Sequence, residues 1–203
     1  MNPPLILVGS GGHAKVVIST CRAAGRDILF AVDSDESRVG LEVLGVRIVA
    51  MDEAISLREA EWVLAFGSNQ GRADHDKLNS RPWGTVVHPS AIVDASAQIG
   101  EGTVVFAGSI VQPEARVGRH VILNTACSVD HDCDIADYAH VGPGARLCGG
   151  VSVGEGALMG VGSSARPGVQ IGAWATVGAG STAIGDLDGG FVYAGVPAKR
   201  LNK

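Results

Sequence analysis

A six-residue repeat dominates the C-terminal half of this chain and constrains its fold more than any other feature. From Val93 to Ala183 every sixth residue is apolar, without interruption over sixteen hexads. The residue two places earlier in each hexad is small, and Gly directly follows the apolar position in seven of the sixteen hexads. Two columns that stay in phase over this length indicate a solenoid built from one repeated unit.

Each hexad would supply one short strand and one turn, so that three hexads close a triangular coil of eighteen residues. Coils would stack as parallel strands about 4.8 Å apart, with between five and six coils from residue 88 to about 186. The apolar column would fill the prism and the small column its tight corners, with Gly where a turn needs unusual backbone angles or a close approach. The pattern resembles the hexapeptide-repeat, left-handed parallel β-helix. The left-handed sense rests on that resemblance, because crossover connections are generally right-handed.

Composition agrees with a narrow prism and excludes several classes of protein. The chain of 203 residues has 29 Gly, 4% aromatic and 46% hydrophobic residues, which does not fit a disordered chain. A net charge of −5 and few Lys leave no basic patch for nucleic acid. There is no positive leader and no long apolar segment, and the four Cys show no CxxC spacing. We therefore expect a cytoplasmic protein with no nucleic-acid partner and no membrane span.

The first 84 residues lack the hexad pattern and alternate between predicted strands and helices. An apolar run at Leu5–Val8 is followed by a helical pattern that ends near Gly25, and a second strand is expected at Ile28–Val32. Further elements are expected at Met51–Ala60 (helix), Trp62–Phe66 (strand) and Gln70–Leu78 (helix). The alternation predicts a Rossmann-like α/β domain at residues 1–84, followed by an all-β β-helix domain with a C-terminal cap at residues 85–203.

A glycine-rich turn joins the first predicted strand to the first helix. Gly9-x-Gly11-x-x-Ala14 is followed nineteen residues later by Asp33. In this context the glycines allow phosphate to approach the helix N-terminus closely, and the acid can bind a ribose. A tight turn without a ligand is the alternative, and His13 could face phosphate or be purely structural. Because so short a domain holds few strands for nicotinamide binding, a nucleotide-linked substrate fits better than NAD.

The pair His131-Asp132 stands at a predicted turn of the repeat, so the imidazole should point away from the prism. Eighteen residues later, Gly149 would lie on the adjacent coil, where it offers an amide N–H and no side chain to crowd the ring. A general base beside an amide donor and an open slot is what acyl transfer to an amine or hydroxyl requires. A solvated turn histidine without a catalytic role is the alternative.

No metal site is expected, although some hexapeptide β-helices, the γ-class carbonic anhydrases, hold Zn²⁺ through histidines. His120, His131 and His140 are spaced by eleven and nine residues, so none stacks on another at eighteen. At the C-terminus, Lys199 and Arg200 follow the end of the repeat. They would belong to a cap over the last coil and could also meet a phosphate group.

The motifs of both halves together resemble a known family. They are Gly9-Ser10-Gly11-Gly12-His13, Val32-Asp33, Gly67-Ser68-Asn69, His88-Pro89-Ser90-Ala91, Leu123-Asn124-Thr125, Val129-Asp130-His131-Asp132, His140-Val141-Gly142 and Gly195-Val196-Pro197-Ala198-Lys199. Over nearly its whole length the chain is similar to the hexapeptide-repeat sugar O-/N-acyltransferases (sialic acid O-acetyltransferase-like), above all to bacterial UDP-4-amino-sugar N-acetyltransferases of bacillosamine-type synthesis. The resemblance implies an acetyl-CoA-dependent N-acetyltransferase that acts on a nucleotide-linked amino-dideoxy sugar, as a homotrimer with active sites between subunits.

The resemblance also implies a role for each matching residue. His131 would be the general base that takes a proton from the sugar amine, Asp132 would orient it, and the Gly149 N–H would bind the thioester oxygen. Family members often have Glu at the position of Asp132, and two consecutive acids where this chain has Asp33-Ser34-Asp35. The nucleotide sugar would be held by Gly11, Gly12, His13, Asp33, Asn69 and Asn124, and acetyl-CoA by His140, Gly149 and Lys199.

Other functions stay open at this point. The same scaffold could acetylate a hydroxyl of sialic acid or a related sugar, or it could bind a sugar nucleotide without catalysis. The identity of the nucleotide base and of the sugar is not defined by these motifs.

Overall fold

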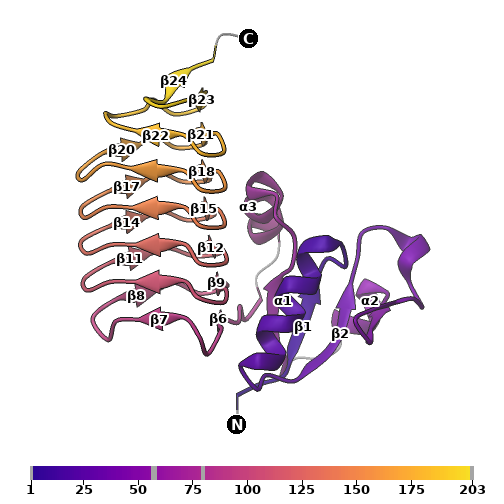
Figure 1. Ribbon diagram of the computed structural model, residues 1–203. Coiled ribbons are helices and arrows are strands. Elements are labelled where there is room, and N and C mark those ends of the chain that lie inside the picture. The colour runs from indigo at the N-terminus through magenta and orange to yellow at the C-terminus, as the bar shows by residue number, and fades with distance from the viewer. Residues whose placement is uncertain (1, 56–58, 79–80, 202–203) are drawn as a thin grey trace.

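The computed structural model describes residues 2–55, 59–78 and 81–201, in which an α/β domain packs against the side of a long parallel β-helix (Figure 1). The α/β domain begins with β1 (Leu5–Val8), α1 (Gly12–Ala23) and β2 (Ile28–Val32), as predicted. Later come β5 (Glu61–Leu64) and α3 (Asn69–Leu78), and the sheet order is β3-β4-β2-β1-β5. β1 pairs in parallel with β2 and β5, so the loop that leads into α1 lies at the carboxyl edge of the sheet.

A short hairpin follows β2 and was not predicted. β3 (Glu42–Val43) pairs antiparallel with β4 (Val46–Val49) through a turn at Leu44 and Gly45, which both have positive φ. Two-residue hairpin turns with positive φ at both central positions favour Asn-Gly or Asp-Gly, so Leu44-Gly45 gives only a weak sequence signal for this hairpin. A single turn of 3-10 helix, η1 (Glu36–Arg38), precedes it.

Two predicted elements are shorter than expected. α2 spans Met51–Ile55, whereas the prediction reached Ala60, which is not helical; residues 56–58 lie outside the described residues. The strand expected at Trp62–Phe66 is β5, which ends at Leu64.

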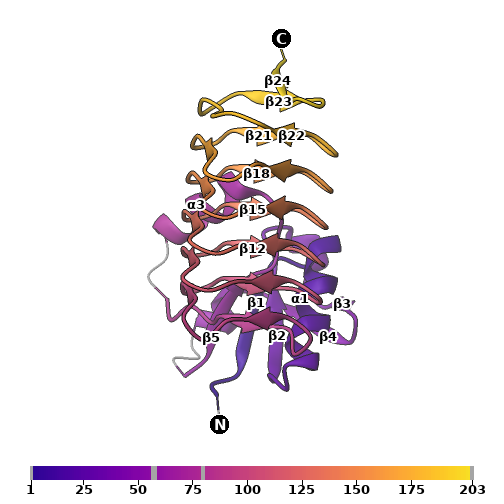
Figure 2. The same cartoon turned by 60° about the vertical axis from the view of Figure 1, so that its left-hand side comes forward.

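The second part of the chain is the predicted left-handed parallel β-helix, whose stacked coils are seen from two sides in Figures 1 and 2. Its strands form three sheets, parallel except at the final strand β24, in which the partners up to β22 are eighteen residues apart, as in the pair Ser128–Arg146. We call them the docked, middle and outer sheets, in the order in which the chain passes through them. The docked sheet consists of β6 (Val86–Val87), β9 (Val104–Val105), β12 (Ile122–Leu123), β15 (His140–Val141), β18 (Leu158–Met159), β21 (Thr176–Val177), β23 (Val192–Ala194) and β24 (Lys199–Arg200).

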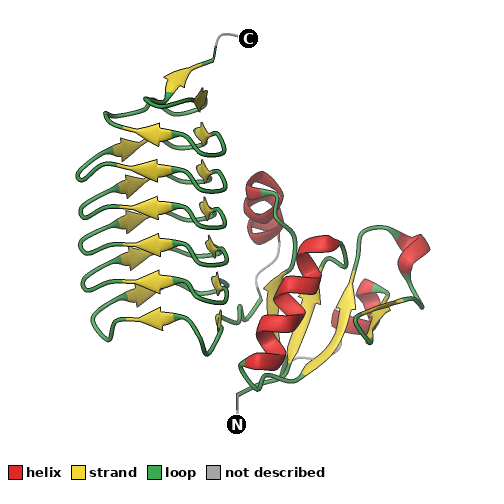
Figure 3. Cartoon of the chain, in the orientation of Figure 1, coloured by secondary structure: helices red, strands yellow, loops and turns green. Residues whose placement is uncertain are grey.

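The other two sheets contain only two-residue strands. The middle sheet consists of β7 (Ile92–Val93), β10 (Ile110–Val111), β13 (Ser128–Val129), β16 (Arg146–Leu147), β19 (Ser164–Ala165) and β22 (Thr182–Ala183). The outer sheet consists of β8 (Gln98–Ile99), β11 (Arg116–Val117), β14 (Asp134–Ile135), β17 (Ser152–Val153) and β20 (Gln170–Ile171). Colouring by secondary structure shows that α1, α2 and α3 all belong to the α/β domain (Figure 3).

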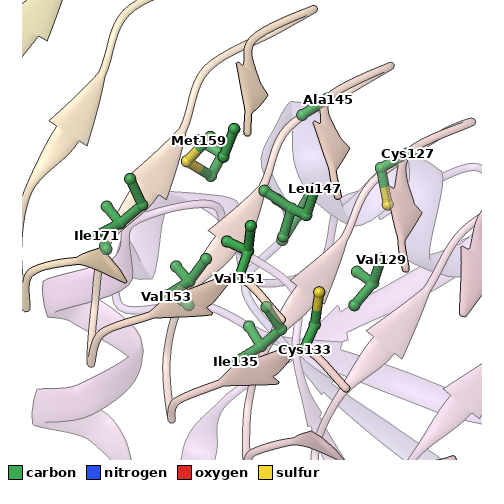
Figure 4. Close-up of a cluster of buried hydrophobic side chains, with 14 of the residues drawn as sticks. Cys127, Val129, Cys133, Ile135, Ala145, Leu147, Val151, Val153, Met159 and Ile171 are labelled. Carbon is green, nitrogen blue, oxygen red and sulfur yellow. The ribbon is translucent and has the colours of Figure 1, made fainter. Parts of the chain in front are cut away.

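Both sequence columns fill the interior of the prism. Figure 4 shows Leu147 and Met159 of the apolar column and Cys127 and Cys133 of the small column in one buried cluster. The small residues follow each turn directly, so the wall can bend there without crowding the interior. Each buried Val, Leu or Ile side chain contributes about 1.5–3 kcal/mol, and the repeat supplies one or more of them in most hexads.

Glycine was expected in the hexads for unusual backbone angles or for close approach, and the structure shows these two uses at different positions of the hexad. Within residues 81–201, positive φ recurs three residues after the apolar position, at Gly102 and every sixth residue to Gly180, and not directly after it. Several of these positions hold other residues, among them His120 and Asp132. A Gly directly after the apolar position serves close approach instead, since a Cβ on Gly100 would lie 2.5 Å from the next coil's backbone.

An apolar interface joins the α/β domain to the β-helix. Leu5 and Leu7 of β1 share one buried cluster with Val104 and Ile122, which face outward from the docked sheet. The outward positions of the outer sheet are polar by contrast, namely Gln98, Arg116, Asp134, Ser152 and Gln170. The α/β domain thus covers one face of the prism along its first coils and leaves the coils nearest the C-terminus uncovered (Figures 1 and 2).

The C-terminal strands close the far end of the β-helix. β23 and β24 pair antiparallel, and the guanidinium of Arg200 lies 3.2 Å from the centre of the Phe191 ring. This arrangement is the expected cap. No helix in the described parts of the chain is long and apolar enough to cross a membrane.

Candidate active site

The pair His131-Asp132 forms the corner between the middle and outer sheets, at the turn that joins β13 to β14. The Nδ1 atom of His131 lies 2.7 Å from Oδ2 of Asp132, so the shorter aspartate side chain does reach the imidazole. The hydrogen bond to Asp132, helped by the charge of Asp130, raises the pKa of His131 above its usual value. With 61% of its side chain exposed, His131 presents Nε2 to the outside of the prism.

Gly149 lies against the imidazole of His131 on the next coil, as predicted from the eighteen-residue period. A Cβ on Gly149 would lie 2.5 Å from both Cε1 and Nε2 of His131. The neighbouring amides of Cys148 and Gly150 donate to carbonyls within the coil stack. Among the described residues no such bond involves the Gly149 N–H, which leaves it available beside the edge of the ring that carries Nε2.

The glycine-rich loop lines a cavity at the carboxyl edge of the α/β sheet. The cavity has a volume of about 390 Å³, and its wall includes Ser10, Gly11 and Asp33 together with Gly71 and His75 of α3. The first turn of α1 has no side-chain cap, so its amides remain free to bind an anion. A second cavity of about 540 Å³ adjoins it at Asp33.

Asp33 is held in place at the end of β2 by its neighbours. Its carboxylate accepts hydrogen bonds from the amide and hydroxyl of Ser10 and from the amide of Asp35. Although partial burial acts in the opposite direction, these bonds and the charge of Arg38 lower the pKa of Asp33. The carboxylate is therefore ionised and oriented toward the cavity that it lines.

A second polar cluster lies where α1 meets the docked sheet. Nδ2 of Asn124 lies 2.9 Å from Nε2 of His140, and the His13 ring is centred 6.4 Å from that of His140 and 5.4 Å from that of Phe106. Burial, with smaller contributions from the charge of Arg72 and from His13, lowers the pKa of His140 to about 3. Burial and Arg72 likewise lower the pKa of His13 to about 4, so both histidines are neutral near pH 7.

The two clusters lie on opposite edges of the middle sheet. Asn124 follows β12 of the docked sheet, the chain then crosses the middle sheet as β13, and His131 follows at the far corner. His131, Asp132 and Gly149 are therefore brought together, and so are His13, Asn124 and His140. The two sets do not meet within one chain.

Comparisons with known proteins find the same two-domain architecture. The family described as the PglD N-terminal domain matches residues 4–75. PerB from Caulobacter crescentus, solved in complex with CoA and GDP-perosamine, is 40% identical over 98% of this chain and 97% of that chain, with a TM-score of 0.90. The acetyltransferase domain of PglB from Neisseria gonorrhoeae FA1090, solved in complex with acetyl coenzyme A, is 34% identical over 99% of this chain and 100% of that chain, with a TM-score of 0.90. The chain belongs to the hexapeptide-repeat family of sugar N-acetyltransferases.

The expected family and the expectation of an acetyltransferase are thereby confirmed. A variant of perosamine N-acetyltransferase from Caulobacter crescentus, in which a histidine is replaced by asparagine, matches with the same identity and a TM-score of 0.91. WeeI from Acinetobacter baumannii AYE, at 20% identity over 98% of this chain and 99% of that chain, shares the fold with a TM-score of 0.86. A comparison with curated proteins gives no match.

The remaining predicted site residues of this acetyltransferase lie outside both polar clusters. Gly12 is the first residue of α1 and stands next to the cavity wall formed by Gly11. Asn69, at the start of α3, donates its amide to the carbonyl oxygens of Gly156 (2.9 Å) and Ala157 (3.2 Å), so it faces the β-helix. Lys199 is exposed in the cap.

Sequence reasoning missed the polar residues that join α3 to the β-helix. Asp76 accepts a hydrogen bond from the Tyr138 hydroxyl at 2.7 Å and lies 3.2 Å from Nε2 of His120, which is fully buried against Trp83. His120 is thus part of a domain contact. No group of three or more potential metal ligands occurs in the described residues.

Proposed function

We propose that this acetyltransferase transfers the acetyl group of acetyl-CoA to the amino group of a nucleotide-linked amino-dideoxy sugar, with His131 as the general base. One observation carries the proposal: the imidazole of His131 is 61% exposed with Nε2 next to Gly149, while Oδ2 of Asp132 lies 2.7 Å from Nδ1. The relatives support the choice of substrates, since PerB was solved with CoA and GDP-perosamine and the PglB domain with acetyl coenzyme A.

The geometry suits direct transfer without an acetyl-enzyme. The sugar amine would attack the thioester carbonyl carbon and form the new C–N bond, while Nε2 of His131 takes the proton from the amine. Asp132 would stabilise the imidazolium through Nδ1–H, and the Gly149 N–H would bind the oxygen as it becomes negative. The C–S bond then breaks, and the CoA thiolate leaves and takes up the proton from His131.

The nucleotide would lie in the cavity of the α/β domain. Gly11 and Gly12 at the start of α1 would bind the diphosphate, and Asp33 would bind a ribose hydroxyl. We assign residues 1–84 to this nucleotide-sugar-binding domain and residues 85–203 to the acyltransferase domain. In support, Trp83 forms a parallel β-bridge with Trp62 of β5 and so belongs to the first domain, whereas the docked sheet begins at Val86.

The sugar would extend from the cavity toward His13, Asn124 and His140. His140 was expected on the acetyl-CoA side, but its contact with Asn124 and its proximity to His13 favour a place near the sugar. Asn69 bonds to the β-helix and would support this site indirectly. On the acetyl-CoA side, Gly149 remains the proposed contact for the thioester and Lys199 for a phosphate of CoA.

We further propose a homotrimer with active sites between subunits. Each chain carries the base on one edge of the middle sheet and His13, Asn124 and His140, which we call the sugar cluster, on the other, so a complete site needs two chains. The outward positions of the middle sheet are mostly uncharged, namely Ile92, Ile110, Ser128, Arg146, Ser164 and Thr182, as suits a face that another chain covers. The cytoplasmic location stays a prediction.

A thiol-release assay tests the proposal. Purified enzyme with acetyl-CoA would be offered UDP-, GDP- and dTDP-linked amino sugars, with free sialic acid as the hydroxyl acceptor. We expect CoA release with a nucleotide-linked amino sugar, and a loss of about 10²–10⁴-fold in His131→Ala, the usual contribution of a general base. Release with sialic acid alone would favour the O-acetyltransferase, and near-normal transfer by His131→Ala would exclude the assigned base.

A further inference from the structure

Arg72 in α3 is a charged side chain in a place where the proposed mechanism does not use it. Only 1% of it is exposed, and it is the largest of the fully buried side chains among the described residues. Within its own domain it donates to Gly67 O (3.1 Å) and to Oδ1 of Asn69 (3.1 Å). It reaches the β-helix by donating to three carbonyl oxygens, those of His120 (2.9 Å), Tyr138 (2.7 Å) and Ala139 (3.3 Å).

The burial of this guanidinium is costly and uncompensated by an opposite charge. Its hydrogen-bond partners are all neutral oxygens, and in the described ranges no carboxylate oxygen lies within 4.0 Å of the guanidinium. Burial lowers the pKa of Arg72 to about 9, so it is still protonated near neutral pH. Desolvating an ion costs several kcal/mol, and a purely adhesive contact would be made more cheaply by apolar residues. The planar guanidinium group donates in fixed directions, so its role here must be to position the two domains relative to each other.

The bonds of Arg72 end next to the sugar cluster. Tyr138 and Ala139, whose carbonyls it binds, directly precede His140 in the chain. Its partner Asn69 donates to the carbonyl of Ala157, which directly precedes Leu158, the residue paired with His140 on the next coil. Arg72 and Asn69 thus hold the segments that lead into β15, which carries His140, and into β18, which pairs with β15.

A neighbouring face of α3, about 100° around the helix from Arg72, lines the nucleotide cavity. Gly71 and His75 line that cavity together with Phe66 in the preceding loop. Arg72 and Asp76 contact the β-helix from the other face of the same helix. In both views of the ribbon, α3 lies alongside the coils that carry β15 and β18 (Figures 1 and 2).

From this arrangement we propose that Arg72 is a positioning residue, which sets the position of the nucleotide cavity relative to the docked sheet so that the sugar amine reaches the acetyl group. This inference rests on the proposed function. It predicts that loss of Arg72 leaves each binding site intact and misaligns them, which lowers the turnover of bound substrates.

The test compares Arg72→Ala and Asn69→Ala with Arg26→Ala as a matched control. Arg26 is also an arginine with little exposed side chain (9%), and it donates to the carbonyl oxygens of Pro3 (3.0 Å) and Thr85 (3.5 Å). Its charge, however, pairs with Glu61 at 2.7 Å. Calorimetric titration with UDP and GDP measures binding at the nucleotide site, and titration with acetyl-CoA measures binding at the acetyl-CoA site. Thiol release at saturating substrates measures turnover. Methylguanidine is then added to fill the space left in Arg72→Ala.

For Arg72→Ala we expect unchanged dissociation constants and a kcat lowered about tenfold to a hundredfold, because a displacement of the reacting groups by about 1 Å causes a loss of this size. Methylguanidine should restore part of the lost kcat. Asn69→Ala should show the same pattern more weakly, and it decides alone if Arg72→Ala does not fold. Arg26→Ala should lose stability and keep its kcat. The inference is overturned by a normal kcat in the folded variant, by diphosphate affinity that falls along with kcat, or by lack of rescue. Failure of the proposed function would look different, since the wild-type enzyme itself would then release no thiol.

Discussion

Replacing Gly149 with Ala should disable the enzyme while leaving its fold intact. The added Cβ would lie 2.5 Å from Cε1 and Nε2 of His131, whereas carbon atoms in contact prefer about 3.5–4.0 Å. Gly149 has no positive φ, so Ala introduces no backbone strain at this position. The exposed imidazole of His131 would yield and move outward by about 1 Å.

The expected loss follows from that displacement. A general base that is misplaced by about 1 Å costs on the order of 10² in rate, equivalent to about 2.7 kcal/mol at 1.36 kcal/mol for each factor of ten. The loss should appear in kcat, measured by thiol release at saturating acetyl-CoA and amino sugar. Because the ring moves into solvent, the midpoint of thermal unfolding should change little.

Gly185→Ala is a matched control on the same corner of the prism. Gly185 is two coils beyond Gly149, at the equivalent position of its hexad, and a Cβ there would have no atom within 4 Å. Its kcat should equal that of the wild type. The double variant Gly149→Ala with His131→Ala should be no slower than His131→Ala, because both changes remove one function. A Gly149→Ala enzyme with normal kcat, or additive losses in the double variant, would refute the placement of the base.

Further predictions concern pH and the corners. In Asp132→Asn, the acid limb of kcat/KM, which in the wild type reflects the raised pKa of His131, should move to lower pH and kcat should fall, as a pH–rate profile would show. The pKa values of His13 (about 4) and His140 (about 3) are depressed, so the unfolded chain binds protons below about pH 6.5 where the folded chain does not. The free energy of unfolding should therefore fall by at least about 2 kcal/mol between pH 6.5 and 4.5, and urea titrations of His140→Asn should show a smaller fall; an equal fall would contradict the assignment. Replacing Ala126, which has a φ of 56°, with Gly should stabilise the protein by up to about 1 kcal/mol. The left-handed conformation costs a residue with a side chain about 1–2 kcal/mol, and the larger conformational entropy that glycine loses on folding offsets part of this gain. Ala107→Gly, at a corner position without positive φ, should lose stability in the same urea measurement.

The β-helix could be predicted from the sequence because its core obeys a strict period. Each apolar side chain points inward and packs on side chains eighteen residues away. The local repeat of six and the packing between coils therefore require an apolar residue at the same positions. The same period predicted that Gly149, eighteen residues after His131, lies next to it on the adjacent coil, as the structure shows. Where the period stops, prediction became weaker, and the hairpin of β3 and β4 was missed.

The docking of the α/β domain was missed although a signal for it exists. The residue before each apolar position faces outward. From Val86 to Thr176 on the docked sheet it is apolar except at His140 and Thr176, whereas it is polar at every equivalent position of the outer sheet. Read at a spacing of eighteen, this outward column identifies the covered face. Arg72 could not be found in this way, because a lone arginine on a polar helix looks like a solvated residue until the helix is placed against three carbonyl oxygens.

The eighteen-residue coil also explains how half-sites on opposite edges of one sheet can form a complete site. Along the chain, His131 lies seven residues after Asn124 and nine before His140, so all three belong to about one turn of the coil and lie at nearly the same height in the stack. Rotation about a threefold axis parallel to the prism changes no height. In the proposed trimer, His131 of one chain would therefore meet Asn124 and His140 of its neighbour at the same level, without any shift along the axis. A narrow prism has no interior space for substrates, and placing base and sugar cluster on the two edges of one face gives every subunit contact a complete set of catalytic groups.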